Sequence, residues 1–238
     1  MSVSYLRRGF ARCLNYLFAP GLCLACGCEL DDAKSLCDSC SQQLRRVPNP
    51  CQYCGQPNPI DALLCPACLL NPPRWQKLIA PLQYRGLVRD YLLQLKFSEA
   101  LYLSRTLCEQ CIDPFRQSSP QPEVLLPVPL HRTRLLERGY NQAYEIATVW
   151  SAALDIPVDR HALTRPRATP SQSGLSASQR KRNVRKAFVY APKHEYRHVA
   201  LVDDIVTTGS TVTEITGLLH RAGVEYVEVW ALARVYRR

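Results

Sequence analysis

Residues 199–215 read Val-Ala-Leu-Val-Asp-Asp-Ile-Val-Thr-Thr-Gly-Ser-Thr-Val-Thr-Glu-Ile and predict a strand, a loop and a helix in that order. The first four residues form a continuous apolar run, which is typical of a strand buried on both faces of a parallel sheet. Two carboxylates, Asp203 and Asp204, stand where we expect this strand to end. Apolar residues then recur at helical spacing as far as Leu219. The segment therefore favours an open α/β sheet, in which ligands bind at the carboxyl ends of the strands.

The turn between the predicted strand and helix combines two kinds of ligand-binding group. Its residues are small and rich in hydroxyl groups: Thr207, Thr208, Gly209, Ser210 and Thr211. A helix N-terminus with a glycine and several hydroxyls suits a phosphate. The adjacent carboxylates can accept hydrogen bonds from sugar hydroxyls or orient a hydrated Mg²⁺, so a ribose 5-phosphate would satisfy both halves. The alternative is a helix capped by Ser210 with no ligand, which explains one hydroxyl and neither acid.

This segment resembles the phosphoribosyl diphosphate (PRPP) motif of type I phosphoribosyltransferases: an apolar strand, two acids, two variable residues and Thr-Thr-Gly-Ser-Thr. The resemblance implies that Asp203 and Asp204 hold the ribose hydroxyls and that residues 207–211 cradle the 5-phosphate. It also implies a reaction that transfers ribose 5-phosphate from PRPP, with Mg²⁺, to a nitrogen nucleophile. No segment that would recognise a base is identifiable, so the sequence leaves catalysis open.

Size, charge and hydropathy limit the classes of protein to consider. The 238 residues suffice for one medium α/β domain and a small module. A net charge of +10 favours anionic partners such as nucleic acid or a phosphorylated substrate. No run of 18 apolar residues is present, so we expect no membrane span and a cytoplasmic protein. Residues 1–20 predict a basic amphipathic helix.

Apart from Cys108 and Cys111, whose Cys-x-x-Cys pair stands alone within a predicted helix, eight of the 12 cysteines form four such pairs, and the second two pairs repeat the first two at an offset of 28 residues. The eight are Cys23, Cys26, Cys37, Cys40, Cys51, Cys54, Cys65 and Cys68. This pattern predicts one tetrahedral, structural zinc site in each copy. Disulfides are the main alternative, and interlaced ligation, with one pair from each copy, is a second.

A proline-rich linker at residues 71–74 predicts a domain boundary. We therefore expect a double zinc-ribbon module over residues 21–71 and an α/β domain over residues 75–238, with a mostly parallel open sheet flanked by helices. Within that domain the apolar pattern predicts strands near 78–84, 124–126, 163–165 and 224–234, and helices near 87–97, 101–115 and 146–153.

Arginines and neutral polar residues follow the strand predicted at 124–126, where they suit a diphosphate or a nucleic-acid backbone. Farther along, a loop at 169–176 precedes a run of five basic residues within positions 180–186. A solvated helix face is the default interpretation of such a run. The run could instead close over PRPP or follow a nucleic-acid backbone. The candidates for anion contacts are Arg132, Arg138, Asn141, Gln142, Arg180, Arg182 and Asn183.

The order of these motifs along the chain resembles the competence protein F (ComF) family, which includes the GntX-like proteins. The matching features are the paired Cys₄ ribbons, Pro-Val-Pro-Leu-His, Arg-Gly-Tyr-Asn-Gln and the terminal PRPP motif. The resemblance implies a phosphoribosyltransferase-like fold and a role in DNA uptake or the use of external DNA, on the cytoplasmic side. We expect a protein that binds a 5-phosphoribosyl ligand and single-stranded DNA in that role. Two alternatives remain open: an active phosphoribosyltransferase in nucleotide salvage, and a non-catalytic scaffold that recruits a helicase or recombination mediator.

Overall fold

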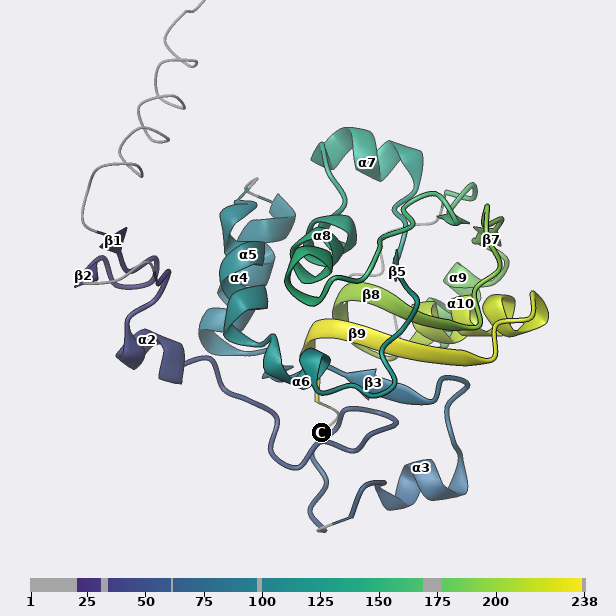
Figure 1. The fold of residues 1–238 in the computed structure, drawn as a ribbon, viewed down its shortest axis with the longest axis horizontal. Helices are drawn as coiled ribbons and strands as arrows, with labels where there is room; N and C mark the ends of the chain where they lie inside the picture. Colours follow the sequence, from purple (N-terminus) through teal and green to yellow (C-terminus); the bar gives the residue numbers. More distant parts are fainter. Residues whose placement is uncertain (1–20, 31–33, 61, 98–99, 169–176, 237–238) are drawn as a thin grey trace, which may run out of the picture. The chain divides into compact units, whose positions relative to one another are not determined.

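The computed structural model describes residues 21–30, 34–60, 62–97, 100–168 and 177–236 (Figure 1). The helix expected over residues 1–20 and the loop expected at 169–176 lie outside these ranges. Two compact units divide the chain between Leu44 and Arg45. This division falls between the two cysteine copies, whereas the sequence placed the boundary after both, at residues 71–74. The second copy therefore belongs to the same unit as the sheet.

The first unit contains a small cysteine-bearing hairpin. Strands β1 (Gly21–Leu22) and β2 (Glu29–Leu30) pair antiparallel, and helix α2 (Asp38–Gln42) follows. The turn between the strands ends at Gly27, whose φ of 74° lies in the left-handed region that glycine adopts without steric cost. This short turn brings the first Cys-x-x-Cys pair back toward the start of α2.

The larger unit is built on a parallel sheet. Its strands lie in the order β3 (Lys77–Ile79), β9 (Tyr226–Arg234), β8 (His198–Val206) and β5 (Val124–Pro127), and β4 (Leu82–Gln83) also pairs with β9. Every pairing in this sheet is parallel. The predicted fold class, a parallel α/β sheet flanked by helices, is confirmed. A separate antiparallel pair consists of β6 (Leu163–Thr164) and β7 (Val189–Tyr190).

Helices cover both faces of the sheet (Figure 1). On one face α10 (Ser210–Arg221) packs through Ile215 and Leu219 against alternate residues of β5 and β8, such as Leu126 and Leu201. On the other face α8 (Gln142–Leu154) places Trp150 near Trp230 of β9, with a ring-centroid separation of 6.1 Å. The remaining helices are α3 (Pro66–Leu70), α4 (Gly86–Phe97), α5 (Tyr102–Gln110), α6 (Asp113–Arg116), α7 (Arg132–Arg138) and α9 (Ala177–Val184).

Strand β8 is longer than the sequence predicted. We expected it to end at the two carboxylates, but it continues through Asp203 and Asp204 to Val206. The neighbouring strand supplies the reason, because β9 provides register partners for Asp203, Ile205 and Val206. Both acids are consequently held on a strand rather than in a flexible loop.

Candidate functional site

The phosphate-type loop joins the end of β8 to the start of α10. Gly209 occupies the N-cap position of α10 with a φ of 80° and no side-chain cap, and Ser210 is the first helical residue. The alternative in which Ser210 caps the helix is therefore not what the structure contains. The Thr208 Oγ1 atom lies 2.8 Å from Ser210 Oγ, and Thr213 Oγ1 donates to Gly209 O at 2.8 Å. The loop thus presents hydroxyl groups beside a helix N-terminus, a geometry suited to an anion.

The two adjacent acids have different surroundings. The Asp203 Oδ1 atom accepts a hydrogen bond from the backbone N–H of Asp204 at 2.9 Å. Asp204 is buried, and its Oδ2 atom lies 2.7 Å from Nζ of Lys96, the penultimate residue of α4. Asp204 is therefore neutralised by a lysine, while Asp203 is the acid more available to a ligand.

This arrangement shifts the ionisation of the acids and of the lysine. Burial, and then the neighbouring Asp204 carboxylate, raise the pKa of Asp203 to about 8. Burial opposes the charged form of Lys96, but attraction to Asp204 outweighs it and raises the pKa of the lysine. Asp203 therefore titrates close to neutral pH, where it can either accept or donate a hydrogen bond.

The acids, the loop and several cations surround one cavity of about 700 Å³ in the larger unit. Arg134 and Arg138 of α7 and Arg165, which follows β6, line it. Burial and the nearby Arg134 lower the pKa of Arg165, and the Arg165 guanidinium lies 5.2 Å from the ring centroid of Phe188. Cations gathered in this way favour an anionic occupant.

Most of the predicted anion-binding residues reach the cavity, but not all. Its lining includes the following predicted residues: Asp203, Asp204, Thr207, Thr208, Gly209, Ser210, Thr211, Arg138, Asn141 and Gln142. Arg132, Arg182 and Asn183 are not part of it. Arg180 lies in α9, and its side chain is outside the described residues.

Asn141 and Gln142 have structural partners at the cavity wall. Asn141 is the N-cap of α8, since its Oδ1 atom accepts from Ala143 N at 3.1 Å. Gln142 is 3% exposed and accepts a hydrogen bond from Arg138 Nη1 at 2.8 Å. Its Nε2 atom is buried without a hydrogen-bond partner among the described residues. An unpaired buried donor at the cavity wall is costly unless a ligand uses it.

Sequence reasoning missed Lys96, Arg134 and Arg165. Lys96 lies between Leu95 and Phe97 at the end of an amphipathic helix, and these large apolar neighbours are the one local signal that its side chain is partly buried. Its partner Asp204 is 108 positions farther along the chain. Nothing local therefore identifies the ion pair.

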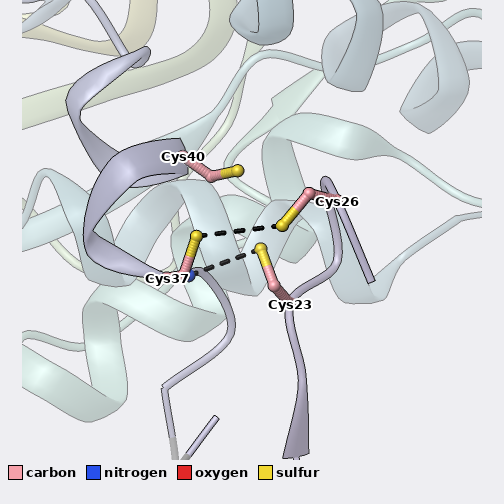
Figure 2. A group of neighbouring side chains, drawn as sticks. All are labelled: Cys23, Cys26, Cys37 and Cys40. Atoms are coloured by element: carbon pink, nitrogen blue, oxygen red, sulfur yellow. Dashed lines mark hydrogen bonds between the residues drawn. The ribbon is translucent and has the colours of Figure 1, made fainter. Parts of the chain in front are cut away.

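The first cysteine copy gathers its four thiols in one place. Figure 2 shows Cys23, Cys26, Cys37 and Cys40 with their sulfur atoms brought together. The Sγ atoms of Cys26 and Cys37 are 3.9 Å apart, and the backbone N–H of Cys37 donates to Cys23 Sγ at 3.4 Å. Burial opposes ionisation of Cys23, but hydrogen bonds from the backbone, that of Cys37 first, lower its pKa to about 6.

The second copy repeats this geometry. Cys51, Cys54, Cys65 and Cys68 form a second group, with the Cys54 and Cys65 sulfurs 3.7 Å apart. The backbone N–H of Cys65 donates to Cys51 Sγ at 3.3 Å. Burial opposes ionisation of Cys51, but backbone hydrogen bonds, that of Cys65 first, lower its pKa to about 7.

Both groups fit a metal ion. In each, the four sulfurs lie within 4.8 Å of one another, and none of the eight cysteines forms a disulfide. Four thiolates donating to one centre are typical of a closed, structural zinc ribbon. The cysteines group by copy, so the interlaced arrangement is not the one observed.

Across the described ranges, no helix combines the length and apolar character needed to cross a membrane.

No family model matches the chain. Curated proteins do match it over nearly its whole length. Competence protein F of Haemophilus influenzae is 38% identical over 221 residues, which cover 89% of this chain and 96% of that protein. The DNA utilization protein YhgH of Escherichia coli K12 is 39% identical over 224 residues, or 92% of this chain and 99% of that protein. Competence protein ComFC of Bacillus subtilis is 25% identical over 75% of each chain.

Solved structures with a related arrangement include two adenine phosphoribosyltransferases. The enzyme of Leishmania donovani has 16% sequence identity and a TM-score of 0.34, and the match covers 58% of this chain and 55% of that one. The enzyme of Trypanosoma brucei has 15% identity and a TM-score of 0.31, with 56% and 53% covered. At TM-scores this low, the likeness carries no conclusion about this chain.

Proposed function

The chain belongs to the competence protein F family, and from that premise we propose that it binds a 5-phosphoribosyl ligand of the PRPP type while serving the uptake or use of external DNA in the cytoplasm. The observation that carries the proposal is the cavity, where the acid pair, the hydroxyl-rich loop and three arginines meet. Asp203 would hold ribose hydroxyls, and residues 207–211 would hold the 5-phosphate. The relatives are a competence protein and DNA utilization proteins, and that role is extended here to this chain.

The arginines Arg134, Arg138 and Arg165, which line the same cavity as the loop, support a diphosphate subsite there. Their positive charge would offset the charge of a PRPP diphosphate, which Mg²⁺ would accompany. If turnover occurs, the bond from ribose C1 to the diphosphate oxygen breaks and its electron pair leaves with the diphosphate. A nitrogen nucleophile forms the new bond to C1 and gives up a proton. The residues of this cavity would bind and orient the ligand, and no covalent nucleophile is required.

We infer that each four-cysteine group holds one structural zinc ion. The support is the chemistry of the donors, four thiols whose backbone hydrogen bonds favour thiolates at Cys23 and Cys51. Zinc content measured by atomic emission should be close to two ions per chain.

The ligand proposal is tested by isothermal titration of PRPP with Mg²⁺. Wild-type protein is expected to bind, and Asp203→Asn/Asp204→Asn is expected to lose binding. A control with the same change of charge is Asp90→Asn/Glu109→Gln, because both control side chains are exposed and neither lines the cavity. Absence of binding to wild type, or equal binding by the acid variant, would reject a phosphoribosyl site.

A second candidate function is binding of single-stranded DNA. It is supported by the net charge of +10 and by Arg132 and Arg182, which are exposed and outside the cavity. Fluorescence anisotropy with labelled single strands should show affinity that falls steeply with salt and is unchanged in Asp203→Asn/Asp204→Asn. If Arg132 and Arg182 contact phosphates, replacing either with alanine should reduce the slope of log affinity against log salt concentration by about 0.7 to 1. Binding of neither ligand would favour a scaffold for a helicase or recombination mediator.

A further inference from the structure

The second cysteine copy is hydrogen-bonded to the sheet through its first knuckle, the turn formed by residues 51–56. Four bonds join the two: Leu78 N to Gln52 O at 2.7 Å, Trp75 Nε1 to Tyr53 O at 2.5 Å, Arg234 Nε to Cys54 O at 2.8 Å and Gln56 Nε2 to Val235 O at 2.9 Å. Backbone carbonyls of three successive knuckle residues therefore accept hydrogen bonds from Leu78, Trp75 and Arg234. This knuckle also carries two of the four thiols of the second group.

Arg234 connects the knuckle to the phosphate-type loop. Its Nε atom donates to Cys54 O, while its Nη1 atom donates to Val206 O at 2.7 Å and also to Thr207 O. The side chain is 3% exposed and is the last residue of β9. A single guanidinium thus donates hydrogen bonds to Cys54, a predicted metal ligand, and to Val206 and Thr207, where β8 leads into the loop.

Trp75 makes a second, independent connection. Its indole N–H donates to Tyr53 O, and its ring lies against Gly209. A Cβ atom placed on Gly209 would stand 3.2 Å from Trp75 Cη2, so the ring and the loop backbone are in close contact. Gly209 is the N-cap of α10, and the position of the indole therefore bears directly on the helix N-terminus that lines the cavity.

The knuckle has no core of its own that would fix these carbonyls. Six residues cannot bury enough apolar surface to order a turn, and metal–thiolate bonds supply that order in ribbons of this kind. The first copy makes an instructive contrast. A Cβ placed on Gly27 meets nothing within 4 Å, whereas one placed on Gly55 would stand 2.6 Å from Leu78 Cδ2. The second knuckle is thus packed closely against the sheet.

We propose that metal bound by Cys51, Cys54, Cys65 and Cys68 positions the phosphate-binding loop through Arg234 and Trp75, so that the second metal site sets the affinity for the phosphoribosyl ligand. Arg234 and Trp75 are positioning residues, because they act on the loop backbone. The ligand in this statement rests on the proposed function. The ordering of the loop by the metal does not depend on the proposed function, and this ordering can be measured without any ligand.

Linkage provides a test in the wild-type chain. If the metal strengthens ligand binding, the ligand must strengthen metal binding by the same factor. Equilibrium competition with a chromophoric zinc chelator should show PRPP with Mg²⁺ raising the zinc affinity of one site per chain by about tenfold or more. Cys26→Ser/Cys37→Ser keeps only the second site and should retain the full effect. Cys54→Ser/Cys65→Ser keeps only the first and should show none. Equal protection of both sites, or of neither when PRPP binds, would overturn the proposal.

Hydrogen exchange without PRPP separates this proposal from the function on which it rests. In Cys54→Ser/Cys65→Ser the amides of residues 206–213 should exchange at least about tenfold faster, while amides of α8 keep their wild-type rates as a control for folding. Cys26→Ser/Cys37→Ser should exchange like wild type. Should the second-site variant fail to fold, Trp75→Phe serves instead, since it removes both the donor to Tyr53 O and the indole atoms Cη2 and Cζ2 that lie against Gly209. It should raise loop exchange about two- to fivefold. Unchanged loop exchange in the folded variant would reject the proposal, whereas wild-type protein that ignores PRPP would reject only the ligand.

Discussion

The two cysteine copies are nearly identical in local geometry and differ in what surrounds them. In both, the second cysteine of the first pair is followed directly by a glycine with positive φ, Gly27 at 74° and Gly55 at 65°. The backbone bonds repeat at the same offset, with Gly27 N to Cys23 O and Gly55 N to Cys51 O both at 2.8 Å. The first copy lies in its own unit, and the second is part of the unit that carries the sheet.

Ligand spacing thus determines the local fold of each ribbon but not what the ribbon packs against. The requirement for glycine is the same in both copies, because both knuckles use the left-handed region. Only Gly55 is also pressed against a neighbouring side chain, Leu78. The two copies share their cysteine geometry, and the second is packed against the sheet of its own unit.

Loss of metal ligands is expected to give the largest contrast between the copies. In zinc-loaded protein, Cys51→Ser/Cys68→Ser should lower the melting temperature of the larger unit by about 10 °C or more, because metal binding contributes directly to its folding. The three tryptophans, Trp75, Trp150 and Trp230, all lie in that unit, so their fluorescence reports its melting alone. The matched variant Cys23→Ser/Cys40→Ser should leave that transition in place. Equal shifts in both variants would remove the distinction.

The paired glycines give the next largest effect. Gly55→Ala should cost about 2 to 4 kcal/mol of unfolding free energy, from the strained φ together with the 2.6 Å approach of the new methyl to Leu78. Gly27→Ala should cost only the backbone strain of a positive φ, and this cost falls on the stability of the first unit. Urea unfolding followed by tryptophan fluorescence should detect the first change and not the second. Measured in a Leu78→Ala background, where the clash is absent, Gly55→Ala should cost less than it does in the wild type. An equal cost in the two backgrounds would contradict the packing argument.

Lys96 tests whether the support from the second copy is separate from the ion pair that neutralises Asp204. Lys96→Met leaves the Asp204 carboxylate unneutralised next to an anionic ligand, so PRPP affinity should fall about tenfold, or about 1.4 kcal/mol. Trp75→Phe acts through the loop instead. In a double-mutant cycle measured by calorimetry the two effects should add within about 0.5 kcal/mol. A larger departure from additivity would mean that Trp75 and Lys96 affect PRPP binding through the same part of the structure.

The smallest effect concerns pH. The pKa of Asp203 is raised to about 8, so in this range the folded state holds a proton that the unfolded state has released. The contribution of this group to stability is full below the unfolded pKa of about 4 and is lost as the pH rises toward 8. Asp203→Asn should therefore flatten the decline in stability between pH 5 and pH 8, as followed by thermal melting. A decline that is identical in Asp203→Asn would assign it to another group.

The sequence predicted the parts of the fold whose signals are local. The apolar run at 199–202, the helix after Gly209 and the duplicated cysteines each show their pattern within a few residues. The predicted end of β8 at the two acids was wrong because the extension of the strand to Val206 depends on pairing with β9. Two acidic residues in succession do not show the apolar pattern from which a buried strand is predicted. The pair of Lys96 with Asp204 and the bonds of Arg234 join residues far apart in the chain, and no local pattern encodes such contacts.

Strand β9 lies between β3 and β8 and follows every other strand of its sheet in the chain. Synthesis proceeds from the N-terminus, so the ribosome releases β3, β5 and β8 while the strand that belongs at the centre is still missing. Until residues 226–234 emerge, the apolar edges of β3 and β8 stay open to other chains, and Cys54 O lacks its donor Arg234. The nascent protein therefore depends on its last strand for protection against aggregation. We expect it to need chaperones more than a protein whose central strands come first.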